Sequence, residues 1–224
     1  MNDDLRHVPG AHSVHTIEAR THGRYLVHVP NGSPPWPLLV GFHGYGETAI
    51  DHLNELTRIP GSDAWLLVAI QALHPFYTRN ERVVASWMTR EDREHAMADN
   101  VDYVGRVLDR VRQEYEPRPT LVFSGFSQGG AMAYRAAAHY RADGLIILAA
   151  DAPPDVIAQQ PVALPPVLIG RGIRDGWYTE AKAAADLKAL MGIGARVGTC
   201  VFEGAHEWTD PFRAAASTFL RRLQ

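Results

Sequence analysis

The fold of this chain is decided by residues 120–132, which read TLVFSGFSQGGAM. Residues 120–125 are rich in apolar and β-favouring side chains, so they predict a strand, and the Ala-rich residues 128–140 predict a helix. Gly125 and Gly129 flank Ser127 at a spacing of two residues on either side. A tight turn between strand and helix leaves no room for side chains at these two positions. We therefore expect Ser127 at the apex of a strand–turn–helix unit.

The rest of the chain alternates strands and helices. We expect strands at 38–42, 65–72, 144–150, 167–170 and 196–202, and helices at 47–58, 90–116, 179–191 and 211–222. Residues 14–19 and 24–29 flank His22-Gly23 and predict a hairpin. Helical connections of this length imply parallel strands. Residues 1–224 are therefore expected to form a single α/β domain with about eight mostly parallel strands, helices on both faces and little or no cap.

Composition excludes several classes of protein. A formal charge of −3 over 224 residues gives no electrostatic footprint for nucleic acid or an anionic membrane surface. Cys200 is the only cysteine, so an internal disulfide and a cysteine-rich metal site are excluded. Residues 1–12 show no secretory leader, and no apolar run approaches the ~20 residues of a membrane-spanning helix. We expect a cytoplasmic protein.

Ser127 has the surroundings of a nucleophile. A serine between a strand and a helix, in the pattern Gly-x-Ser-x-Gly, forms a nucleophile elbow that projects the hydroxyl above the sheet. The alternative is a glycine-lined packing turn. The backbone N–H of Gln128 follows at a helix N-terminus, where it can stabilise an oxyanion.

A base and an acid are expected after the serine, in the order acid and then histidine. His139 and His206 are the only histidines beyond Ser127, and His139 lies within the helix that begins at the elbow. His206 follows the last strand and is the expected general base. Asp175 and Asp151 each follow the carboxyl end of a strand, and we favour Asp175 because it follows the strand next to the one that leads to His206.

A second oxyanion donor is expected from residues 41–47, which read GFHGYGE. The glycines let this loop curl towards the site, which leaves the backbone N–H of Tyr45 as the candidate. The same glycines superficially suggest nucleotide binding, but the acidic ribose partner and the surrounding unit are not convincing. We expect no cofactor and no metal.

Together, these motifs resemble the phospholipase/carboxylesterase family, also described as acyl-protein thioesterase-like, of the α/β-hydrolase superfamily. The matching segments are His43-Gly-Tyr-Gly46, Trp87, Gly125-Phe-Ser-Gln-Gly-Gly130, Asp175 and Gly204-Ala-His-Glu207. The resemblance implies a cofactor-free serine esterase with Ser127, Asp175 and His206 as its triad and the N–H groups of Tyr45 and Gln128 as its oxyanion hole. Glu47 stands where the family usually has Asp, and residues around Asp175 also depart from its pattern.

Two tryptophans, Trp87 and Trp177, are expected to bind the substrate, since aromatic walls around an acyl group exclude water. Ordinary packing of large loop residues is the alternative. The sequence thus predicts a hydrolase of short to medium acyl esters, with thioesters as a second substrate class. An amide or peptide hydrolase with the same triad and a catalytically silent binding protein remain as alternatives. A homodimer is compatible with the sequence, but no residue pattern identifies one.

Overall fold

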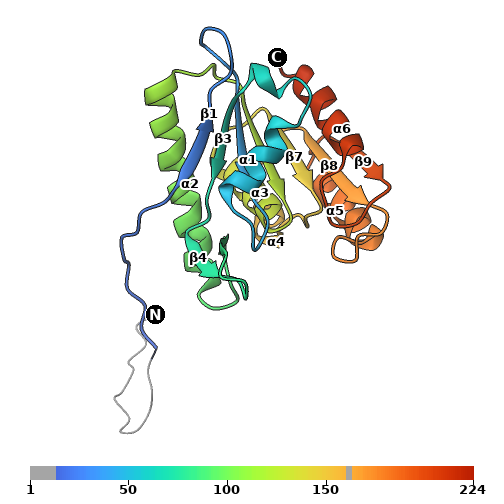
Figure 1. Cartoon of the computed structure of the whole chain (residues 1–224). Coiled ribbons are helices and arrows are strands. Elements are labelled where there is room, and N and C mark those ends of the chain that lie inside the picture. The colour runs from blue at the N-terminus through green and yellow to red at the C-terminus, as the bar shows by residue number, and fades with distance from the viewer. Residues whose placement is uncertain (1–13, 160–162) are drawn as a thin grey trace, which may run out of the picture.

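A seven-stranded sheet forms the centre of the computed structural model, which describes residues 14–159 and 163–224 (Figure 1). Its strand order is β1-β3-β2-β6-β7-β8-β9, and each neighbouring pair is parallel except β1 with β3. The strands are β1 (Tyr25–His28), β2 (Leu38–Phe42), β3 (Leu66–Ile70), β6 (Leu121–Phe126), β7 (Gly144–Leu148), β8 (Val167–Gly172) and β9 (Val197–Phe202). The central strands β2, β6 and β7 are buried at every position, as expected for parallel strands covered on both faces.

Helices cover both faces of this sheet, which confirms the predicted fold class. Gly41 of β2 pairs with Ser124 of β6, so Gly41 and the next residue, Gly125, face opposite sides of the sheet. A Cβ on Gly41 would lie 2.3 Å from a side chain of α1, and a Cβ on Gly125 would lie 2.3 Å from the backbone of α3. The helices α1 and α3 therefore cover opposite faces. In Figure 1, α2 lies beside the β1 edge, and α5 and α6 lie beside β9. The helices are α1 (Ala49–Thr57), α2 (Arg93–Tyr115), α3 (Gln128–His139), α4 (Pro154–Ile157), α5 (Glu180–Gly192) and α6 (Asp210–Arg221), with a 3₁₀ turn η1 at Ser62–Ala64.

The predicted N-terminal hairpin is wrong. Residues 14–19 form no strand, and Val14 and Ile17 are 89% and 93% exposed. Within the described part of the chain, β1 pairs with β3 alone and ends the sheet. The main sheet therefore has seven strands, where about eight were predicted.

A different hairpin was missed, between the predicted strand at 65–72 and the predicted helix at 90–116. β4 (His74–Tyr77) and β5 (Val83–Ser86) pair antiparallel as a separate two-stranded sheet. β4 is mostly exposed and contains Pro75, so it carries no alternating apolar pattern that a sequence could reveal.

Along the described chain, no helix combines the length and the apolar character that crossing a bilayer requires. The prediction that residues 1–12 lack a secretory leader concerns positions outside the described residues.

Candidate active site

Ser127 occupies the tight turn that joins β6 to α3. Its backbone angles, φ 53° and ψ −123°, fall in a region that non-glycine residues rarely adopt. A Cβ on Gly129 would lie 2.1 Å from the carbonyl oxygen of Phe42, and a Cβ on Gly125 would lie 2.3 Å from that of Gly129. Both obstacles are backbone atoms, so the predicted steric requirement for glycine is confirmed.

The structure brings Ser127, His206 and Asp175 into direct contact. The Oγ atom of Ser127 lies 2.8 Å from Nε2 of His206, and Nδ1 of the same ring lies 2.8 Å from Oδ2 of Asp175. A carboxylate can only accept, so Nδ1 carries the proton and donates to Asp175. Nε2 is then left to accept from the serine hydroxyl. This is the tautomer that a general base for Ser127 needs.

Asp175 is held ionised although its side chain is fully buried. Burial alone would raise the pKa of this carboxyl group, but hydrogen bonds from the Tyr178 N–H, the His206 ring and the Trp177 N–H outweigh it and lower the pKa. Oδ1 accepts from the N–H groups of Trp177 and Tyr178 at 2.8 and 2.9 Å, which leaves Oδ2 for the imidazole.

The loops that carry the acid and the histidine are joined by backbone contacts. The N–H groups of Ile173 and Arg174 donate to the carbonyls of Phe202 and Gly204 at 3.0 and 2.9 Å. The alternative acid, Asp151, lies elsewhere, because its exposed carboxylate pairs with Lys182 at 3.2 Å. Adjacency of β8 and β9 in the sheet therefore places Asp175, and not Asp151, beside the imidazole.

The loop after β2 carries the expected second oxyanion donor, and hydrogen bonds of the buried His43 ring hold this loop in place. The imidazole of His43 is completely buried, its Nδ1 lies 2.7 Å from the carbonyl oxygen of Gly44, and its Nε2 accepts from the N–H of Ala72 at 3.1 Å. Burial lowers the pKa of His43, which keeps the ring neutral with its proton on Nδ1. This role of His43 was not predicted, although a histidine directly after a buried strand is a signal for it.

The β4–β5 hairpin, which was not predicted, contacts the same loop and holds it in place. Gly46 donates to the carbonyl of Ala85 at 3.1 Å, Ala85 donates to the carbonyl of Glu47 at 3.0 Å, and the ring of Tyr45 stacks on Phe76 of β4. The Gln128 side chain ties the elbow to the residues after β5, because its Oε1 accepts from the N–H of Trp87 at 2.9 Å. Among the described residues, the N–H groups of Tyr45 and Gln128 have no protein acceptor. Both donors are therefore available for an oxyanion.

Trp87 has no exposed surface for a substrate, which corrects the prediction for this residue, whereas Trp177 lies outside the lining of the cleft beside His206 and its contact with substrate stays a prediction. Trp87 is fully buried, with its indole N–H donating to the carbonyl of His43 at 2.8 Å and its ring against those of His43 and Phe42. It supports the loop from within the core. Trp177 is 76% exposed and contributes its backbone N–H to Asp175.

The cleft beside the imidazole has a volume of about 440 Å³ and is lined by Glu47, by α1 with Arg58 at its end, by Phe126, by residues 206–208 and by Arg213 of α6. Its aromatic wall is Trp208, next to Phe126. Two of its charged residues, Arg58 and Arg213, come from segments far apart in the sequence, so no local motif could identify them as neighbours. Within residues 14–159 and 163–224, no group of three or more His, Cys, Asp or Glu side chains is arranged to bind a metal ion.

Comparison with known proteins agrees with this fold. No protein-family model matches the chain, and no curated protein matches its sequence. A carboxylesterase of Bacillus cereus superposes with a TM-score of 0.71 at 17% identity, over 90% of this chain and 95% of that one. Esterase PE8 gives 0.69 at 24% identity over 90% and 98%, and acyl-protein thioesterase 2 of Zea mays gives 0.69 at 19% identity over 90% and 99%. The chain therefore has the α/β-hydrolase fold, in the form found in carboxylesterases and acyl-protein thioesterases.

Proposed function

We propose that this protein is a serine hydrolase that cleaves carboxylic esters through an acyl-enzyme on Ser127. The observation that carries the proposal is the chain of two 2.8 Å contacts from Ser127 through His206 to Asp175. A protein that merely binds a ligand has no need for a buried carboxylate, a correctly oriented imidazole and a serine on a strained turn in one line. The likeness in fold to esterases and a thioesterase supports the same reaction class.

In the first half-reaction, the Ser127 Oγ attacks the carbonyl carbon while its proton passes to Nε2 of His206. The oxygen of the tetrahedral intermediate accepts from the N–H groups of Tyr45 and Gln128. The imidazolium, stabilised by Asp175, then gives its proton to the leaving alkoxide or thiolate as the carbon–oxygen or carbon–sulfur bond breaks. The products of this step are the acyl-enzyme and a free alcohol or thiol.

In the second half-reaction, water takes the place of the alcohol. Nε2 of His206 accepts a proton from the water as its oxygen attacks the acyl carbon, and the same proton later returns to Oγ of Ser127. Carboxylic acid leaves, and the free serine is regenerated. This part needs no cofactor, because each proton moves between groups that the chain itself supplies.

The test is hydrolysis of p-nitrophenyl esters from acetate to decanoate by the wild type and by Ser127→Ala, with fluorophosphonate labelling beside it. We expect the mutant to lose activity by about 10⁶-fold and to lose labelling altogether. Ser124→Ala is the matched control, since Ser124 lies in β6, the strand that leads to Ser127, is completely buried and has a hydroxyl without a partner in the described structure. No turnover and no labelling of the wild type would refute the proposal and favour a silent binding protein.

A further inference from the structure

The cleft beside His206 is lined mainly by charged groups. Glu47, Asp51, Glu55 and Glu207 contribute four carboxylates, and Arg58 and Arg213 contribute two guanidinium groups. A long aliphatic chain would gain little from such walls, because it would bury charges without pairing them. A polar substrate group fits them better. The sign of its charge depends on which charges in the lining are already paired.

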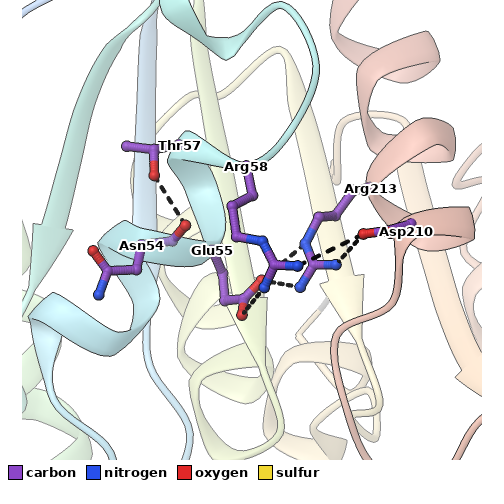
Figure 2. Close-up of polar contacts among 6 residues, drawn as sticks. All are labelled: Asn54, Glu55, Thr57, Arg58, Asp210 and Arg213. Carbon is purple, nitrogen blue, oxygen red and sulfur yellow. Dashed lines mark hydrogen bonds and ion pairs between the residues drawn. The ribbon is translucent and has the colours of Figure 1, made fainter.

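Both guanidinium groups in the lining are already paired (Figure 2). Arg213 of α6, whose side chain is 5% exposed, donates through Nε to Glu55 of α1 at 2.9 Å and pairs with Asp210 at 2.6 Å. Arg58, at the end of α1, lies 3.3 Å from Glu55 and 3.7 Å from Asp210. Two arginines thus face two carboxylates, so this network leaves no unpaired positive charge for an anionic ligand.

The remaining carboxylates give the cleft an excess of negative charge. Asp51 is paired with Arg82, and its carboxylate also accepts from the backbone N–H of Thr48, the N-cap residue of α1. Glu47 accepts from the backbone N–H of Gly44 at 2.7 Å, and Glu207 accepts from that of Ala205 at 3.0 Å. Neither Glu47 nor Glu207 has a cationic side chain as partner within the described residues.

The aromatic residues of the cleft suit a cation as well. Trp208 and Phe126 line it, and tryptophan is the aromatic side chain that attracts cations most strongly. His52, 1% exposed, lies edge-on to Trp208 with 5.7 Å between the ring centres, and neither of its ring nitrogens has a hydrogen-bond partner in the described structure. Burial, with a smaller effect from His43, lowers the pKa of His52 to about 3, so its ring stays neutral and does not repel a positive charge.

We infer that the ester cleaved at Ser127 carries a compact, positively charged group of the ammonium type, which occupies the cleft between Glu47 and Glu207 against Trp208. The inference rests on the proposed function, and it names the substrate class of that same site. The quantity that reports the inference is the ratio of kcat/KM for a charged ester to that for a neutral one, because any effect of the cleft carboxylates on His206 or Ser127 acts on both esters alike.

The experiment compares esters that differ only in charge. In the first pair the charge is on the alcohol: acetylcholine is compared with its neutral isostere, in which carbon replaces nitrogen. In the second pair the charge is on the acyl group: the p-nitrophenyl ester of trimethylammoniobutyrate is compared with its carbon isostere. For each pair, the ratio of kcat/KM for the cationic ester to that for the neutral ester is measured in the wild type, Glu207→Gln and Glu203→Gln. Glu203 is the matched control, because it is exposed in the same loop but pairs with Arg174 outside the cleft.

We expect the wild type to prefer the cationic member of one pair, and the pair that responds identifies the side of the ester that enters the cleft. Glu207→Gln should reduce the preference by about two- to fivefold, the range expected for one exposed charge pair, whereas Glu203→Gln should leave it unchanged. Raising the salt to about 0.5 M should reduce the wild-type preference as well.

Three results would overturn the inference. Hydrolysis of both neutral esters at rates equal to or above those of the cationic ones would refute it while leaving the esterase proposal intact. A preference for a hemisuccinate ester over its neutral isostere would also refute it and would assign the cleft to an anion at Arg58. No hydrolysis of any ester, together with no fluorophosphonate labelling, would remove the proposed function and this inference together.

Discussion

Replacing Asp175 with Asn tests the arrangement of the triad more sharply than removing the side chain would. Oδ1 of Asp175 accepts hydrogen bonds from two backbone N–H groups, those of Trp177 and Tyr178. An asparagine keeps both bonds only if its oxygen takes the Oδ1 position. Its NH₂ group must then face Nδ1 of His206, where the carboxylate oxygen now lies at 2.8 Å.

The consequence is a reversal of the histidine tautomer. An NH₂ group can only donate, so Nδ1 has to accept and the ring proton moves to Nε2. Nε2 then cannot take the proton of Ser127 as it attacks. In serine hydrolases, this change of acid to amide reduces kcat by about 10⁴-fold, equivalent to about 5 kcal/mol of transition-state stabilisation.

The assay is p-nitrophenyl ester hydrolysis, with the rate of fluorophosphonate labelling as a measure of serine activation alone. Asp151→Asn is the control, because Asp151 is exposed, pairs with Lys182 and was the alternative acid in the sequence. Its activity should equal that of the wild type. An Asp175→Asn protein that is folded, yet hydrolyses and labels within about tenfold of the wild type, would refute the assignment of the acid.

Three further predictions concern positions around the site. Gly129→Ala should abolish activity, because its Cβ would lie 2.1 Å from the Phe42 carbonyl oxygen and push α3 and its oxyanion donor out of place; wild-type activity in this variant would contradict that geometry. Trp87→Phe should destabilise the protein by at least about 1 kcal/mol in urea unfolding and reduce kcat, since the 2.8 Å hydrogen bond to the His43 carbonyl is lost and the smaller ring leaves a cavity in the core. His52 has its folded pKa lowered to about 3 from 6.5, so its contribution to stability is complete above pH 6.5 and is lost as the pH falls towards 3. Between pH 7.5 and pH 5, the wild type should therefore lose about 2 kcal/mol more stability than His52→Leu; equal losses in urea unfolding would contradict a buried neutral ring.

The central α/β unit could be predicted from sequence because its signals are local. A strand buried on both faces is a short apolar run, and the elbow needs small residues at fixed positions around Ser127. Those constraints act over a few neighbouring residues, and the structure places β6 and α3 within one or two residues of the predicted bounds. His206 could be selected because only two histidines follow the serine.

The strands at the edges of the fold could not be predicted from local sequence patterns. Residues 14–19 have the composition of a strand, but a strand also needs a partner, and the sheet ends at β1. The β4–β5 hairpin has little buried surface in β4, and its position is set by contacts with the loop after β2, such as the stacking of Phe76 on Tyr45. Such contacts between distant segments leave no periodic signal.

The sequence by itself determined the order of strands and helices, the serine turn and the small set of residues from which a base and an acid could be drawn. The tertiary structure decided between Asp175 and Asp151, because strand order in the sheet brings β8 beside β9 and the sequence does not state that order. It also placed Trp87 in the core and assembled the charged cleft from α1, α6 and the loops that precede them. Ion pairs such as Arg213 with Glu55 join residues 158 positions apart, and only the folded backbone brings them within hydrogen-bonding distance.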